Sequence, residues 1–148
     1  MKTVKIMIMR QAVIDEVGKS TAYAGAKSTG DSAADFNRVA TIGADDELLG
    51  RFWNEAAVAV TARLREFVAS ADYSGAALDL TLSLSSSYDD TQTPSVSSLL
   101  FSYMARSIIA KWYAFTLKEE AQTAAVQAEG YLADAASRCY WRRPPRRR

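Results

Sequence analysis

Histidine is absent from this sequence of 148 residues, and cysteine occurs once, as Cys139. Histidine is the commonest general base and metal ligand in proteins, so its absence argues against most acid–base and zinc chemistry. A single cysteine cannot form an intramolecular disulfide, and we interpret Cys139 as a small buried or half-buried apolar residue. The glycines form neither G-x-G-x-x-G nor G-x-x-x-x-G-K, the loops that bind nucleotide phosphates. This inventory predicts a binding or assembly protein with no cofactor and no catalytic activity.

Proline and long apolar runs are also scarce. No proline precedes Pro94, and alanine is frequent, which together favour helices. The longest uncharged stretch, residues 91–105, is rich in serine and threonine and is too short to span a bilayer. The short apolar run at the N-terminus is interrupted by Lys5, and no small-residue cleavage site follows it. We therefore expect a soluble intracellular domain with no membrane partner.

The charge is divided unevenly along the chain. Residues 138–148 hold six arginines and no acidic residue, whereas residues 1–137 hold 12 Lys and Arg against 17 Asp and Glu, a balance of −5. A mildly acidic body with a basic end is typical of a chain that contacts something anionic, or an acidic patch on a partner. Arginine in particular suits planar, bidentate contacts with phosphate or carboxylate groups.

Two segments alternate with a period of two residues, as strands with one apolar face do. Apolar side chains occupy every second position of residues 3–8, and four leucines alternate with polar residues at the start of residues 78–86. A two-stranded sheet is marginal by itself and needs a helix over its apolar face. We therefore expect these strands to pair with each other or with strands of neighbouring subunits.

Helical patterns occupy residues 10–20, 45–71, 94–115 and 117–140. Thr93 followed by Pro94 predicts the start of the third helix, and Thr116 with Glu119 predicts a capping box at the start of the fourth. Residues 20–44 show no clear period and are expected to form a long loop. Loops of that length in compact domains are usually functional or ordered by a partner.

The expected fold class is mainly α: a small bundle of about four helices with two short β-strands. It forms a single domain over residues 1–141, followed by a basic tail over residues 142–148. Phe52, Trp53 and Trp112 lie on apolar helical stripes, which favours core packing over base stacking.

The fourth helix carries a narrow face of small side chains that includes Ala121, Ala125 and Ala128. Small side chains permit close approach of another helix, and a strand edge permits pairing with another chain. We therefore predict that this face, together with Leu78 and Leu80 of the second strand, forms the contact between copies.

Acidic residues cluster at two places. We interpret Asp45-Asp46-Glu47 as a helix N-terminus, where negative charge is favourable, and Asp89-Asp90 as a turn. A hard-cation site at Asp89 and Asp90 is the alternative, although the D-x-D-x-D-G spacing of calcium loops is absent.

Aromatic and basic residues interleave where the fourth helix meets the tail. This pattern fits a grip on single-stranded nucleic acid, or an anchor in a groove of a protein partner whose acidic residues pair with the arginines. A merely solubilising basic end is the third interpretation. The predicted partner-binding residues are Tyr140, Trp141, Arg142, Arg143, Arg146, Arg147 and Arg148.

Three stretches of the sequence carry a resemblance to a known family. They are D-D-E-L-L-G-R-F-W-N-E-A-A-V-A-V from Asp45, L-D-L-T-L-S-L-S from Leu78, and S-L-L-F-S-Y-M-A-R-S-I-I-A-K-W-Y from Ser98. Their order over residues 45–143, before a basic C-terminus, resembles the head–tail connector (neck adaptor) proteins of long-tailed bacteriophages and prophages. The N-terminal strand and residues 20–44 are additions relative to the short members of that family.

The resemblance implies a structural virion protein that forms a homo-oligomeric ring, commonly of twelve subunits, around the DNA channel. It implies the portal protein and a tail-side neck protein as partners, with non-specific contact to genomic DNA. The implied location is the neck of the virion, and the host cytoplasm during assembly. In that family the C-terminal segment tends to dock on the portal, and the matching stretch here is Tyr140–Arg148.

Two other functions remain open from the residues alone. The first is a small helical nucleic-acid-binding protein with an Arg-rich C-terminal arm, although the body is acidic and no predicted helix has a basic face. The second is an accessory subunit of an enzyme or another interaction module.

Overall fold

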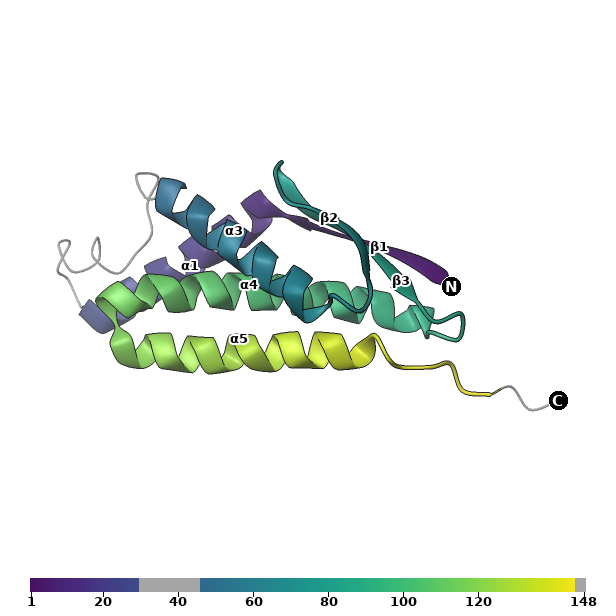
Figure 1. Ribbon diagram of the computed structural model, residues 1–148. Helices are drawn as coiled ribbons and strands as arrows, with labels where there is room; N and C mark the ends of the chain where they lie inside the picture. Colours follow the sequence, from purple (N-terminus) through teal and green to yellow (C-terminus); the bar gives the residue numbers. More distant parts are fainter. Residues whose placement is uncertain (30–45, 146–148) are drawn as a thin grey trace.

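The computed structural model describes residues 1–29 and 46–145, and within them four α-helices pack around a three-stranded antiparallel sheet (Figure 1). The chain order is β1 (Lys2–Met9), α1 (Arg10–Thr29), α3 (Asp46–Arg63), β2 (Val68–Asp72), β3 (Ala77–Leu84), the 3-10 helix η2 (Asp90–Gln92), α4 (Thr93–Thr116) and α5 (Lys118–Arg138). Helices α4 and α5 lie side by side along the length of the molecule, and α3 crosses α4 (Figure 1). The mainly-α fold class is confirmed.

Strand β3 is the centre of the sheet, with β1 and β2 antiparallel on its two sides. The register places Ile6 opposite Leu80 and Ile8 opposite Leu78, so the apolar side chains of both strands share one face. Helices α1 and α4 contact these strands. The predicted pairing of the two alternating segments with each other is confirmed. The register is fixed by burial, because a shift by one residue would turn every apolar side chain of a strand to the opposite face of the sheet.

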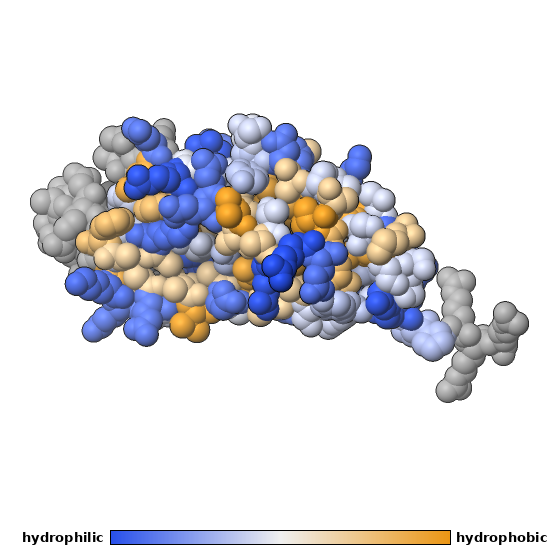
Figure 2. Space-filling view, viewed as in Figure 1, coloured by the Kyte–Doolittle hydropathy of each residue, from blue (hydrophilic) through white to orange (hydrophobic). Residues whose placement is uncertain are grey.

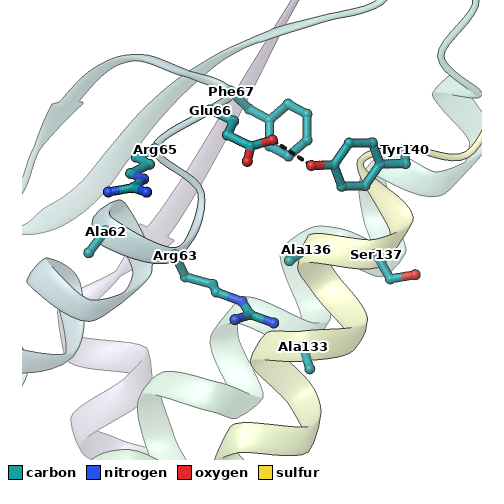
Figure 3. A pocket seen from close by; sticks show the side chains of 9 residues that line it. All are labelled: Ala62, Arg63, Arg65, Glu66, Phe67, Ala133, Ala136, Ser137 and Tyr140. Carbon is teal, nitrogen blue, oxygen red and sulfur yellow. Dashed lines mark hydrogen bonds between the residues drawn. The ribbon is translucent and has the colours of Figure 1, made fainter.

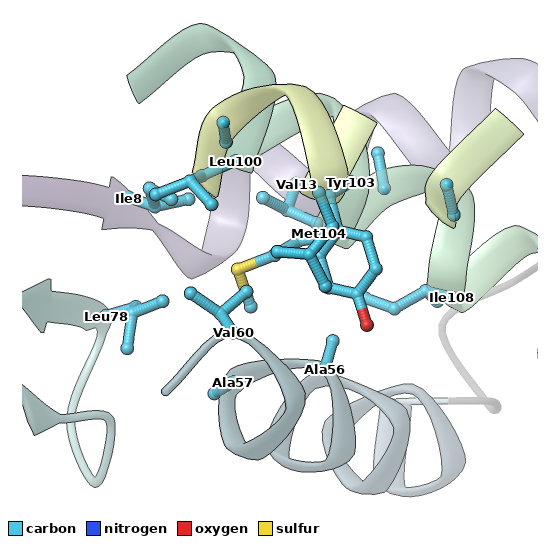
Figure 4. Close-up of a cluster of buried hydrophobic side chains, with 14 of the residues drawn as sticks. Ile8, Val13, Ala56, Ala57, Val60, Leu78, Leu100, Tyr103, Met104 and Ile108 are labelled. Atoms are coloured by element: carbon cyan, nitrogen blue, oxygen red, sulfur yellow. The ribbon is translucent and has the colours of Figure 1, made fainter. Parts of the chain in front are cut away.

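The labelled side chains of Figure 4 come from β1, α1, α3, β3 and α4, and α5 adds further buried residues to the same core. Buried residues from the first five of these elements are Ile8 of β1, Val13 of α1, Val60 of α3, Leu78 of β3 and Met104 of α4. The aromatic core prediction is confirmed, since Trp53 is fully buried and Phe52 and Trp112 are 6% and 8% exposed.

The second predicted helix is shorter than its apolar pattern indicated, and a third strand follows it. Helix α3 ends at Arg63, although Phe67 and Val68 continue its stripe. The Ser83 N–H donates a hydrogen bond to the Phe67 carbonyl at 2.7 Å, and Val68 pairs with Leu82. This pairing satisfies backbone groups along one side of β3 that would otherwise lack partners, so tertiary pairing overrides the helical pattern.

Helix α1 is longer than predicted. It continues past Gly18 to Thr29, so the part of the predicted 20–44 loop up to residue 29 is helical, and the remainder lies outside the described residues. Val17 is buried, and the buried Thr21 hydroxyl donates to the Val17 carbonyl at 2.9 Å. Helix α1 as a whole packs against the sheet and α4, and this tertiary packing stabilises it beyond what its weak sequence pattern predicts.

The start of α4 differs slightly from the prediction. The helix begins at Thr93 with Gln92 as its N-cap, and Pro94 lies in the first turn as expected. Thr93 is therefore not the cap, and its hydroxyl instead shares a hydrogen bond of 3.1 Å with the Tyr88 hydroxyl.

The corner between α4 and α5 also differs. Thr116 is the last residue of α4, and the N-cap of α5 is Leu117, which leaves no place for the predicted capping box. The chain reverses at Leu117, whose backbone is not helical, and Phe115 is 75% exposed beside it. Phe115 is the last residue of the helical pattern over residues 94–115, whose apolar side chains we expected to point inward, and it does not do so, because the helix pair turns before that side chain is covered.

The small-residue face of α5 packs within the chain instead of between copies. Its buried residues, which lie on the side toward α4, are Ala124, Ala128, Leu132 and Ala135. Of the predicted oligomer contacts on this helix, Ala128 is buried, Ala121 is half-buried and Ala125 is exposed. The narrow face lets two long helices approach closely, so its small residues serve the fold.

We expect Ala128→Leu to destabilise the protein by about 1–3 kcal/mol, because the added methylenes have no room between α4 and α5. Ala125→Leu, one turn away and exposed, is the matched control and should change stability by no more than about 0.5 kcal/mol. Urea unfolding followed by circular dichroism measures both. If the two variants are equally stable and only Ala128→Leu loses assembly, this face forms the contact between copies, as the sequence predicted.

Candidate functional site at the C-terminal end

The chain beyond α5 is held against the body as far as Arg143. The N–H of Asp89 donates to the Trp141 carbonyl at 3.1 Å, and the N–H of Arg143 donates to the Ser87 carbonyl at 2.9 Å. These bonds flank an antiparallel bridge between Tyr88 and Arg142. The predicted boundary at residue 142 was therefore two residues early, because the sequence alone does not reveal this pairing.

The two aromatic residues of this segment are partly exposed and held in place. Tyr140 is 52% exposed, its hydroxyl donates to Glu66 Oε2 at 2.5 Å, and its ring meets that of Phe67 edge-on at 4.9 Å. The hydrogen bond to the Glu66 carboxylate raises the pKa of Tyr140. Trp141 is 44% exposed, and the Arg138 guanidinium lies over its ring at 4.8 Å.

The arginines of the C-terminal cluster divide into two groups. Arg138 donates to Asp134 at 3.2 Å and to Gln92 at 2.8 Å, so it holds the end of α5 to the start of α4. Arg142 and Arg143 are exposed and make no ion pair with any described residue. Arg146, Arg147 and Arg148 lie outside the described residues.

A groove of about 560 Å³ lies beside this segment, between the end of α3 and the end of α5 (Figure 3). Its lining residues are Ala62, Arg63, Arg65, Glu66, Phe67, Ala133, Ala136, Ser137 and Tyr140. Strongly hydrophilic side chains gather on the face where α3 ends near α5 (Figure 2). Arg63 extends toward α5, whereas Glu66 and Tyr140 meet across the other end of the groove (Figure 3).

Arg63, Arg65 and Glu66 were not predicted as site residues. The sequence pattern placed them inside a helix that continued to residue 71, far from the C-terminus. Because α3 ends at Arg63 and the chain turns toward β2, these side chains lie beside Tyr140 instead. One feature of the sequence could have identified them: Arg63 and Arg65 are separated by a single residue, which puts two positive charges near one helix end.

The strand residues predicted as contacts between copies belong to the core. Leu78 is fully buried, Leu80 is 1% exposed, and β3 is paired on both edges. Neither side chain nor the edges of this strand are free to meet another subunit. This prediction was wrong because the third strand, β2, was not foreseen.

The acidic turn is structural. Asp89 Oδ1 accepts hydrogen bonds from the Thr91 hydroxyl at 2.6 Å and the Thr91 N–H at 3.1 Å, which lower its pKa. Asp90 pairs with Lys2 at 2.8 Å. Within the described residues no group of three acidic, cysteine or histidine side chains is placed to hold a metal ion.

Cys139 is 2% exposed, and its burial raises the thiol pKa to about 11. The thiol is therefore protonated near neutral pH and unreactive, which confirms its interpretation as a buried apolar residue. Among the described helices, none is both long and apolar enough to cross a membrane.

No protein-family model, curated protein or solved structure matches this chain.

Proposed function

We propose that this protein is a head–tail connector subunit that assembles as a ring between portal and tail and docks on the portal through Tyr140–Arg148. The single observation that supports the proposal best is the C-terminal segment itself. It presents an exposed indole and two unpaired guanidinium groups, Arg142 and Arg143, on a backbone held by hydrogen bonds.

Preorganisation makes this segment suitable for docking. Trp141 and the two arginines lose little backbone freedom on binding, because the bonds to residues 87–89 already fix their backbone. Tryptophan and arginine are also the residues that most often dominate binding energy at interfaces. Tyr140 contributes from the wall of the groove, since its hydroxyl is bonded to Glu66.

The charge distribution favours a protein partner over DNA as the main contact. The body carries a net charge of −5 over residues 1–137, so as a whole it repels a nucleic acid that lies along it. Channel DNA then adds a non-specific, salt-dependent contribution through the tail arginines.

A nucleic-acid-binding protein is the second candidate, and one observation favours it. Arg63 and Arg65 line the same groove as Tyr140 near the C-terminal end of α5, so the basic surface is larger than the tail alone. Glu66 and Asp134, which lie in the same region, weaken that surface for phosphate.

We test the proposal by binding to a portal ring from the same genome. Deletion of residues 142–148 should leave the thermal midpoint within a few degrees, since it removes one backbone hydrogen bond, from Arg143, worth about 1 kcal/mol. Trp141→Ala should weaken docking about 30-fold, the effect of removing an interface anchor. Biolayer interferometry measures the affinities.

Salt and a matched control separate the contributions. Arg142→Ala with Arg143→Ala should reduce both affinity and its salt dependence, because the charge contribution is screened over about 8 Å at physiological ionic strength. Lys5→Ala with Arg51→Ala removes the same charge from exposed positions elsewhere and should leave docking unchanged. Loss of fold on deletion would contradict the proposal, and sequence-specific duplex binding by the tail would favour the second candidate.

A further inference from the structure

We infer that the groove between α3 and α5 binds the α4–α5 corner of a neighbouring copy of this chain. This inference rests on the proposed function, because it names the contact that joins subunits. The two surfaces lie at opposite ends of α5. The groove carries positive charge and short apolar side chains, and the corner carries acidic side chains and an exposed phenylalanine.

The groove supplies two positive charges over an apolar floor. Arg63 and Arg65 are both exposed, and neither guanidinium group forms an ion pair with a described residue. The acidic group of the lining, Glu66, is already bonded to Tyr140. Ala133 and Ala136 of α5 line the groove with short apolar side chains (Figure 3).

The α4–α5 corner supplies the apolar side chain of Phe115 and a net negative charge from the exposed Lys118, Glu119 and Glu120. Phe115 is 75% exposed, a large value for a phenylalanine in a protein with a well-formed core. Glu119 and Glu120 follow in the first turn of α5, where both are exposed and form no ion pair with a described residue. The corner therefore matches the groove in charge and in polarity.

The length of α5 makes the contact intermolecular. The helix has 21 residues and spans about 31 Å, so Glu119 of one copy cannot reach Arg63 of the same copy. A contact between opposite ends of the molecule repeats from copy to copy, and it closes into a ring when the rotation between copies permits. The corner is also a better occupant than a nucleic acid strand, because its two carboxylates match the two guanidinium groups in number, whereas a strand brings further phosphates that the Glu66 carboxylate repels.

Charge exchange tests the contact. Arg63→Glu with Arg65→Glu should weaken self-association at least ten-fold in sedimentation velocity, and Glu119→Arg with Glu120→Arg should do the same. Mixing the two double variants should restore assembly, since each reversed surface then meets an opposite charge. Lys5→Glu with Arg51→Glu, exposed and away from both surfaces, changes the net charge equally and should leave association unchanged.

The outcomes separate this contact from the proposed function. The contact would be overturned if either the groove variant or the corner variant associated as the wild type does, or if mixing the two gave no recovery. It would also be overturned if the wild-type protein stayed monomeric at high concentration. Loss of single-stranded DNA binding in the groove variant with unchanged self-association would overturn it as well. If mixing restores association but assembly stops at a two-fold dimer, the contact is supported and the ring is contradicted. Portal docking is measured independently, through the deletion of residues 142–148.

Discussion

Replacing Trp53 with alanine is expected to lower the free energy of unfolding by about 3–5 kcal/mol, a large part of the stability of a domain this size. Trp53 is fully buried on α3, in the core shared with α4 and the sheet. The substitution removes a large apolar surface and leaves a cavity that the surrounding helices can fill only in part. Urea unfolding followed by circular dichroism, with an unchanged m-value, measures the loss.

Two control variants make the Trp53 result specific. Trp53→Phe should cost much less than alanine, because it keeps an aromatic ring and removes an indole N–H that is buried without a hydrogen-bond partner. Phe115→Ala removes an aromatic ring that is 75% exposed and should have little effect on stability. Equal losses for Trp53→Ala and Phe115→Ala would mean that the helical faces are misplaced.

Replacing Leu80 with alanine is expected to cost about 2–5 kcal/mol, with the effect on folding and not on association alone. Leu80 lies on the central strand, opposite Ile6 on one side and Ala71 on the other, and is 1% exposed. Its truncation loosens the packing of all three strands against the helices. The same urea experiment, repeated at several protein concentrations, separates a core residue from a contact between copies.

Asp79 is the matched control for Leu80, because it is the adjacent residue of β3 and is exposed. The register places it opposite Asp72 of β2, so two like charges face each other across the strands. Asp79→Asn should therefore be neutral or slightly stabilising, since like charges at paired positions are unfavourable. A loss of stability as large as that of Leu80→Ala would contradict the assignment of the two faces of the sheet.

Local patterns were enough where a segment meets one environment along its whole length. The alternation of residues 3–8 and 78–86 predicted β1 and β3 with their buried faces, since each strand has the core on one side. The apolar stripe of residues 94–115 predicted α4 within one residue at each end for the same reason. The chemistry of the Asp89 turn and the aromatic core followed from residue type and spacing alone.

Local patterns failed where the partner of a segment is distant in sequence. Val68–Asp72 carries no strand pattern, and it is extended because β3 offers hydrogen bonds. The small face of α5 has the same composition whether it meets another subunit or α4, so its neighbour is decided by the fold.

The sequence by itself determined which residues avoid water, where charge collects and which chemistry is absent. The tertiary structure alone decided what those residues contact: it attached Arg142 and Arg143 to residues 87–89 and brought Arg63 and Arg65 beside Tyr140. The physical reason is that charge is a property of single side chains, and the tendency to be buried follows from single side chains and from their short repeating pattern along a helix or strand. A groove, in contrast, depends on where two separate helices end, and that position is set by the packing of the whole chain.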